Sequence, residues 1–152
     1  MADSLQLAGL GRGGRVWMDM GAGGGFPGVV LGIAAELERV VLVESIAKKC
    51  AFLREAVAVT GARCEVANAR VEALAPVRPD VITARALASL DKLFGWGMRH
   101  ARRDTIWVLP KGMRHAAEIH AAQQEYDFVH ELVSSMTEAE ARVVVAHSVT
   151  RR

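Results

Sequence analysis

A glycine-rich stretch that follows a short apolar segment is the feature of this sequence that most restricts its fold. Residues 16–28 read VWMDMGAGGGFPG. Val16–Met20 is short and mostly apolar, which is typical of a buried strand. Glycines so close together cost conformational entropy, and they are useful where the backbone must turn tightly or approach a ligand closely. Pro27 and the apolar residues 29–35 then predict a helix. The stretch therefore indicates a nucleotide-binding unit of strand, glycine turn and helix.

Two cofactor classes fit this unit. Residues 23–28 satisfy the pattern G-x-G-x-x-G, which on its own is weak evidence for a nicotinamide or flavin fold. Asp19, at the end of the strand, favours another cofactor. A dinucleotide places its pyrophosphate at the helix N-terminus, where a nearby carboxylate would repel it. S-adenosylmethionine has no phosphate and carries an ammonium and a sulfonium, so we predict that Asp19 and the turn glycines bind this cofactor: Gly21, Gly23 and Gly25.

Glu44 ends a second apolar run, residues 40–43. An acid at the end of the second strand is placed to accept hydrogen bonds from both hydroxyls of a ribose, in either cofactor class. The alternative is that Glu44 complements the dipole of the following helix, with Ser45 as its N-cap. The glycine turn already present makes the ribose role the stronger interpretation.

Composition limits the possibilities further. With 152 residues, of which 51% are hydrophobic and 24% charged, the chain is expected to fold as one globular domain. It has no apolar run of membrane-spanning length and no signal-peptide pattern, which predicts a cytoplasmic protein without a membrane partner. The two cysteines and five histidines show no metal-ligand spacing, so no metal site is expected. A net charge of +2 does not by itself indicate nucleic-acid binding.

The remaining pattern predicts alternating strands and helices, followed by two extended runs with no helix between them. Alternating elements give parallel strands with right-handed crossovers, whereas the last two runs should form an antiparallel hairpin. The expected fold is an α/β, Rossmann-like class I methyltransferase with a seven-stranded, mostly parallel sheet. Strands are predicted at residues 16–20, 39–43, 64–67, 81–84, 105–109, 128–134 and 141–149, and helices at 29–35, 45–60, 87–100 and 113–124, with a helical turn at 1–10.

Three basic residues follow successive parallel strands: Arg70, Arg85 and Lys111. Ligands of open α/β sheets bind beyond the carboxyl ends of the strands, so these residues should share that edge. Each one alone is explained by a solvated surface charge, but three on one edge favour an anionic partner. A further basic cluster, residues 99–103, is expected at the opposite edge as a solvated helix end.

At this level of detail the sequence resembles a known family. The phrases WMDMGAGGGFPG, VLVES-x-x-KK-x-x-FL, ARVE, VITARALASL and VLPKG occur in that order. They are similar to those of the RsmG (GidB) family of bacterial 7-methylguanosine methyltransferases that act on 16S ribosomal RNA. The GFPG and TARA-x-ASL phrases are much more specific than the glycine pattern, and the resemblance extends over nearly the whole chain.

The resemblance implies an activity and a set of site residues. The activity is N7-methylation of a guanosine in 16S rRNA, with S-adenosylmethionine as cofactor and the small ribosomal subunit as partner. By position, the family's cofactor contacts correspond to Gly21, Phe26, Glu44, Val71 with Glu72, and Arg85. Its basic residues implicated in activity and RNA contact correspond to Arg70 and Lys111.

The resemblance also bears on domain organisation. Family members carry an N-terminal helical region, and this chain begins near its end, so we predict residues 1–14 to be a remnant of that region and a loop. Residues 15–152 are predicted to be the methyltransferase domain, acting as a monomer. Two alternatives remain, namely a cofactor- or RNA-binding remnant without transferase activity and, more weakly, an NAD-linked oxidoreductase.

Overall fold

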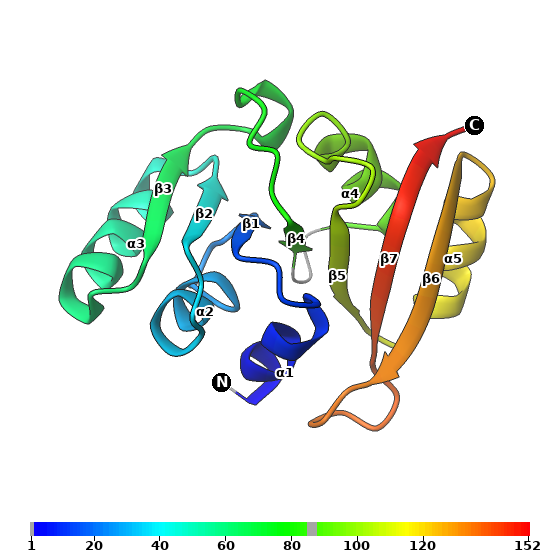
Figure 1. The fold of residues 1–152 in the computed structure, drawn as a ribbon, viewed down its shortest axis with the longest axis horizontal. Coiled ribbons are helices and arrows are strands. Elements are labelled where there is room, and N and C mark those ends of the chain that lie inside the picture. The colour runs from blue at the N-terminus through cyan, green and yellow to red at the C-terminus, as the bar shows by residue number, and fades with distance from the viewer. Residues whose placement is uncertain (1, 85–87) are drawn as a thin grey trace.

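The chain forms one sheet with helices on both faces (Figure 1). The computed structural model describes residues 2–84 and 88–152. In this part of the chain the elements are, in order, α1 (Ala2–Leu10), β1 (Val16–Met20), α2 (Gly28–Ala34), β2 (Arg39–Glu44), α3 (Ala47–Thr60), β3 (Cys64–Asn68), the 3-10 turn η1 (Val71–Ala73), β4 (Val81–Ala84), α4 (Leu90–Gly97), β5 (Ile106–Lys111), α5 (His115–Gln123), β6 (Tyr126–Ser134) and β7 (Arg142–Arg151).

The sheet has seven strands in the order β3-β2-β1-β4-β5-β7-β6. Strands β1 to β5 are parallel, because each is followed by a crossover that returns the chain to the same edge. Strand β7 pairs antiparallel with both β5 and β6. The fold predicted from the sequence, with five parallel strands and a C-terminal antiparallel hairpin, is confirmed. The strand order reverses between β1 and β4, which is where ligands bind in open α/β sheets.

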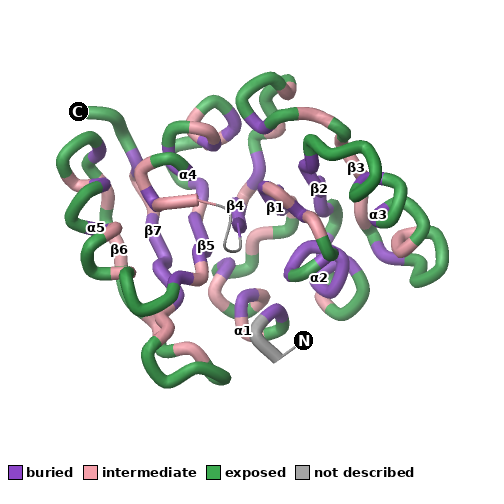
Figure 2. Tube along the Cα trace, turned by 180° about the vertical axis from the view of Figure 1, so that it is seen from behind, coloured by how far each residue is buried: buried purple, intermediate pink, exposed green. Residues whose placement is uncertain are grey.

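Two apolar cores lie on the two faces of the sheet. On one face, Leu7 of α1, Leu31 of α2 and Leu53 of α3 pack against the side chains of the central strands. On the other face, Leu93 and Phe94 of α4 pack with residues of α5 and of the strands. Figure 2 shows the buried residues concentrated on the central strands, with exposed residues on the outer sides of α3 and α5. The central strands are thus buried between apolar cores on both faces of the sheet.

Two element boundaries differ from the prediction in ways that matter for the site. Strand β5 continues to Lys111, whereas the sequence predicted its end at residue 109. Pro110 has no N–H to donate, and it is accommodated because the pairing of β5 with β4 has already ended at Val108. Helix α3 begins at Ala47, and its N-cap residue is Ile46, so Ser45 does not cap it.

Within residues 2–84 and 88–152, no helix has the length and apolar character needed to cross a membrane. The same part of the chain contains no group of three metal-binding side chains placed to hold an ion.

Candidate cofactor and substrate site

The glycine turn after β1 is held against the end of β2 by its own backbone. The N–H groups of Gly21 and Ala22 both donate to the Val43 carbonyl, at 2.8 and 3.0 Å. Three turn residues predicted as cofactor contacts adopt positive φ angles, of 67° at Gly21, 41° at Gly23 and 88° at Gly25. At Gly25 an added Cβ would also lie 3.0 Å from Val29 Cγ2. A residue with a side chain would therefore be strained at position 25, both by the positive φ angle and by the close contact with Val29.

Gly28 is a further required glycine, which the sequence-based site did not include. It is the first residue of α2, and a Cβ there would overlap Leu42 Cδ2 and lie 2.7 Å from Asp19 Oδ2. The Gly28 N–H donates to Asp19 Oδ2 at 3.1 Å. Gly28 therefore allows the first turn of α2 to approach the sheet. The signal in the sequence was its place as the last glycine of G-x-G-x-x-G, which allows close packing of helix on strand.

Asp19 lies behind the turn, with only 2% of its surface exposed. Besides the Gly28 N–H, its carboxylate accepts a hydrogen bond from the Thr83 hydroxyl at 3.0 Å. Burial raises the pKa of Asp19 to about 7, although the hydrogen bonds from Thr83 and Gly28 favour the ionised form. A cation bound nearby would lower that pKa again, so the charge of Asp19 is sensitive to what occupies the turn.

Glu44 connects the glycine turn to the next crossover. Its Oε1 accepts the Gly23 N–H and its Oε2 accepts the Ile46 N–H, both at 3.0 Å. The residue is only 6% exposed. A carboxylate offers about four lone-pair sites, so two remain after these bonds. The buried carboxylate is fixed in orientation and can still accept hydrogen bonds from a ligand with two adjacent hydroxyls.

The segment after β3 carries three of the predicted residues. Asn68 donates from Nδ2 to the carbonyls of Glu44 and Ser45, which places the end of β3 beside the end of β2. Val71 is buried, whereas the Arg70 side chain is 78% exposed and lies 3.6 Å from the Glu72 carboxylate. Phe26, in the glycine turn, is also largely exposed. Arg85 lies outside the described residues.

His100 was missed by the sequence-based reasoning, and it holds this segment in place. Its Nδ1 accepts the Val77 N–H at 3.1 Å, so Nε2 carries the proton and donates to the Val71 carbonyl at 2.7 Å. Burial and the nearby charges of Arg99 and Arg78 lower the pKa of His100, which favours this neutral ring. Only the fold brings His100 to η1, because 29 residues separate it from Val71.

Arginines of the basic cluster 99–103 also have partners, which differs from the solvated helix end that was expected. Arg99 donates to the Glu72 carbonyl at 2.9 Å, so it supports the same segment as His100. Arg102 bonds to Asp80 at 2.6 Å and to Asp104 at 3.1 Å. Asp80 in turn accepts the Val16 N–H at the start of β1. Part of the cluster therefore fastens loops to the sheet.

The predicted position of Lys111 beyond the end of the strand implied a side chain that extends freely from the sheet edge. The structure shows a buried side chain instead. It is the last residue of β5, and its side chain is 6% exposed. The ammonium donates to the Ala88 carbonyl at 2.5 Å and lies 3.0 Å from Glu118 Oε1. Glu118 also accepts the Leu90 N–H at 2.9 Å. Lys111 thus links the ends of β5, α4 and α5.

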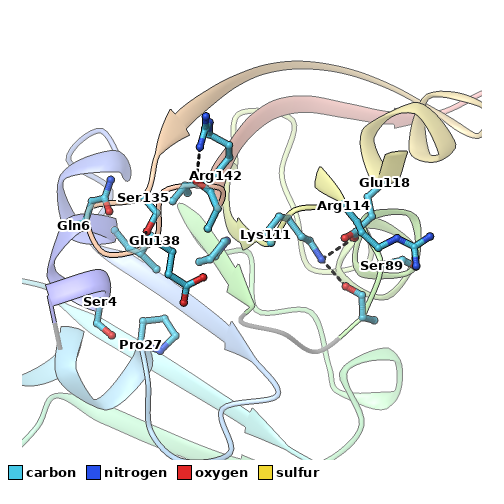
Figure 3. Close-up of a pocket in the computed structure, with 16 residues that line it drawn as sticks. Ser4, Gln6, Pro27, Ser89, Lys111, Arg114, Glu118, Ser135, Glu138 and Arg142 are labelled. Atoms are coloured by element: carbon cyan, nitrogen blue, oxygen red, sulfur yellow. Dashed lines mark hydrogen bonds and ion pairs between the residues drawn. The ribbon is translucent and has the colours of Figure 1, made fainter. Parts of the chain in front are cut away.

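Lys111 lines a cavity of about 600 Å³ beside the glycine turn (Figure 3). Its walls come from α1, the residue before α2, the residues before α4, the end of β5, the first part of α5 and the β6–β7 turn. Pro27 belongs both to the glycine turn and to the cavity wall. The site thus has two parts, the turn with Glu44 and the adjoining cavity, which has the size typical of small-molecule pockets.

The strand order, the glycine turn and the buried acid that ends β2 define a Rossmann-like methyltransferase fold. Solved structures show the same fold. The tRNA methyltransferase TrmK of B. subtilis has 14% sequence identity and a TM-score of 0.74 over 96% of this chain and 65% of that chain. A TehB-like SAM-dependent methyltransferase from Corynebacterium glutamicum has 13% identity and a TM-score of 0.71 over 97% of this chain and 87% of that chain.

Sequence comparison identifies the family. The model of the GidB family, described as rRNA small subunit methyltransferase G, matches residues 1–146. Ribosomal RNA small subunit methyltransferase G of Methylorubrum populi is 41% identical over 156 residues, which cover 99% of this chain and 74% of the relative. The protein of the same name from Gluconobacter oxydans is 41% identical over 142 residues, covering 93% and 73%. The chain belongs to this family, which confirms the resemblance found in the sequence.

Proposed function

We propose that this chain transfers a methyl group from S-adenosylmethionine to N7 of a guanosine in 16S ribosomal RNA. Membership of the rRNA small subunit methyltransferase G family supports the reaction class and the RNA substrate. The observation that carries the cofactor assignment is the Glu44 carboxylate. It is fixed between the Gly23 and Ile46 N–H groups at the end of β2 and keeps two acceptor sites for a ribose.

The residues of the turn fit this cofactor. Glu44 would hold the ribose hydroxyls, and the backbone bend of Gly21–Gly25 would allow close approach of the cofactor. Asp19 would favour the positive charges of the methionine end, while Val71, Glu72 and Phe26 would line the site. Arg85 is proposed as a further contact from its family position. When bound, S-adenosylmethionine supplies an electrophilic methyl group on its sulfonium.

The chain has a limited chemical task in this reaction. Guanine N7 already has a free lone pair, so no side chain needs to remove a proton first. The protein's contribution is to position the base and to arrange charges in advance. We assign Arg70, which is highly exposed, to contact RNA phosphate. Lys111 is assigned to the substrate cavity, where it fixes the wall through Glu118 and the Ala88 carbonyl.

The partner that follows from this activity is 16S rRNA, free or within the small ribosomal subunit. We propose that the protein acts on it as a monomer in the cytoplasm, where ribosomal subunits are assembled. Arg70→Ala should leave cofactor affinity unchanged and flatten the salt dependence of RNA binding by about one unit of slope.

The test is incubation of the full chain with 16S rRNA and with small subunits, followed by mass spectrometry of the digested RNA. The expected product is 7-methylguanosine at one position, which chain scission at the modified base also maps. Methylation of another base or atom, or no methylation with either substrate, would contradict the proposal.

A further inference from the structure

The cavity beside the glycine turn is lined by two polar side chains, from α1 and from the β6–β7 turn, that have no partner among the described residues. Ser4 is 1% exposed, and its Oγ is the one buried side-chain N or O atom in the described part of the chain that lacks a hydrogen-bond partner. The carboxylate of Glu138 has no hydrogen-bond or ion-pair partner among the described residues, and Figure 3 shows it directed into the cavity toward Ser4 and Pro27. Unpaired buried polar groups are uncommon in folded proteins, so the Ser4 hydroxyl indicates a polar ligand, and the exposed Glu138 carboxylate is accessible to the same ligand.

The turn that carries Glu138 is held from several sides. Ser135 Oγ accepts the Glu138 N–H at 3.2 Å. Arg142 donates to the carbonyls of Ala139 and Ala141, both at 2.9 Å. From α1, the Gln6 side chain donates to the Ser134 carbonyl at 2.8 Å and accepts the Met136 N–H at 3.1 Å. These bonds fix the position of the turn before any ligand enters, which favours specific recognition.

We propose that Glu138 is a specificity-determining residue that recognises the Watson–Crick edge of the target guanine. This inference rests on the proposed function. Guanine presents N1–H and an N2 amino group side by side, and one carboxylate can accept both hydrogen bonds. The Ser4 hydroxyl, which lines the same cavity, donates to guanine O6. Adenine presents a lone pair at N1, which the carboxylate repels. Enzymes that act on a base take it out of the stack and bind its exposed edge in a pocket.

The direction of the base agrees with the rest of the site. N7 lies on the imidazole ring of guanine, away from N1 and N2. N7 belongs to the Hoogsteen edge, which adjoins the Watson–Crick edge at O6, so a base held by Glu138 presents N7 to a neighbouring part of the same cavity, whose lining includes Pro27 of the glycine turn. Recognition and methyl transfer thus use adjacent edges of one base, and the contacts to Glu138 leave N7 free.

Replacement of the 2-amino group tests this directly. Inosine lacks only that group and keeps N1–H, O6 and N7, so it can be placed by RNA ligation at the guanosine that the methylation assay identifies. For the unmutated chain, kcat/KM should fall roughly tenfold or more from guanosine to inosine. For Glu138→Ala the guanosine rate should be lower and the guanosine-to-inosine ratio should fall to about twofold.

Glu138→Gln keeps the shape of the side chain but can accept only one of the two hydrogen bonds, so it should give an intermediate ratio. Glu140→Ala is the matched control, because Glu140 is an exposed acid of the same turn that does not line the cavity. A ratio that stays at the unmutated value in Glu138→Ala overturns the recognition role while leaving the methyltransferase assignment intact. An unmutated chain that methylates no guanosine overturns both.

Discussion

The glycine turn with Glu44 and the adjoining cavity lie next to each other, but they are built differently. In the turn, side-chain carboxylates bond to backbone N–H groups within the β1–α2–β2 unit, as Asp19 does to Gly28 and Glu44 to Gly23. In the cavity, side chains from distant parts of the chain meet, and Gln6 bonds to residues 128 and 130 positions away. The turn is thus specified locally, whereas the cavity exists only once the whole sheet has assembled.

This difference has a physical consequence. A backbone-bonded carboxylate keeps its position as long as the β1–α2–β2 unit is folded, so substitutions in the turn should change cofactor binding most. The cavity depends on ion pairs and turns around the ends of β5, β6 and β7. Substitutions there should therefore change substrate turnover while cofactor affinity stays the same. The following predictions separate these two outcomes.

The largest effect is expected at Asp19. Its pKa is raised to about 7 in the folded protein, so between the unfolded value and pH 7 the folded state binds an extra proton. Stability is therefore lost as pH rises through this window, and a shift of about three units corresponds to about 4 kcal/mol. Asparagine does not titrate, so Asp19→Asn should gain stability relative to the unmutated chain by about this amount from pH 4 to pH 8.

Urea unfolding at pH 4 to 8 measures the difference, with Asp91→Asn as a control in the first turn of α4. The same variant should bind S-adenosylmethionine more weakly, because it removes a negative charge beside the turn. Parallel stability curves for Asp19→Asn and the unmutated chain would show that the buried carboxyl does not titrate as described.

Gly28→Ala should destabilise the turn next most strongly. The new Cβ would overlap Leu42 Cδ2 and approach Asp19, so we expect a loss of about 3 kcal/mol and a large loss of cofactor affinity. Gly24→Ala is the matched control, because its Cβ would meet no atom within 4 Å, and its stability should change by less than about 0.5 kcal/mol. Equal unfolding midpoints for the two variants would mean that α2 can move away from the sheet without cost.

A smaller loss of stability is expected for a substitution of Lys111 in the cavity wall. Lys111→Met leaves Glu118 with only the Leu90 N–H, and because Glu118 is 23% exposed the cost should be about 2 kcal/mol. Methyl transfer should fall, while calorimetry should give an unchanged Kd for S-adenosylmethionine. Lys92→Met, at an exposed lysine of α4, should change neither. A parallel loss of cofactor affinity in Lys111→Met would show that the two regions are not separate.

The sequence predicted the locally specified region well and the other region poorly, for the same physical reason. A strand, a glycine turn and an acid after the next strand are close in the sequence, so their spacing alone placed Asp19, Gly25 and Glu44. The proposed roles of Ser4 and Glu138 depend on α1 meeting the β6–β7 turn, a contact that no local pattern encodes. Lys111 was recognised as a site residue, but its burial could not be predicted because the pairing of β5 with β7 extends the strand past Pro110.

His100 shows the same limit on the opposite face of the sheet. A single histidine after a helix has no distinguishing pattern, and its partners Val71 and Val77 are known only from the tertiary fold. The family resemblance supplied Arg70, Val71 and Glu72, but it did not indicate what holds them in place. Sequence motifs thus identified candidate ligand contacts more readily than residues that position them.

The central claim is that Glu44 and the glycine turn hold S-adenosylmethionine, and titration calorimetry tests it most directly. The unmutated chain should bind S-adenosylmethionine and show no binding of NAD. Glu44→Ala should weaken the cofactor Kd about ten- to a hundredfold, because it removes charge-assisted hydrogen bonds to the ribose. Glu36→Ala, at an exposed acid after α2, should leave the Kd unchanged. Equal Kd values for Glu44→Ala and the unmutated chain, or NAD binding as tight as that of S-adenosylmethionine, would contradict the claim.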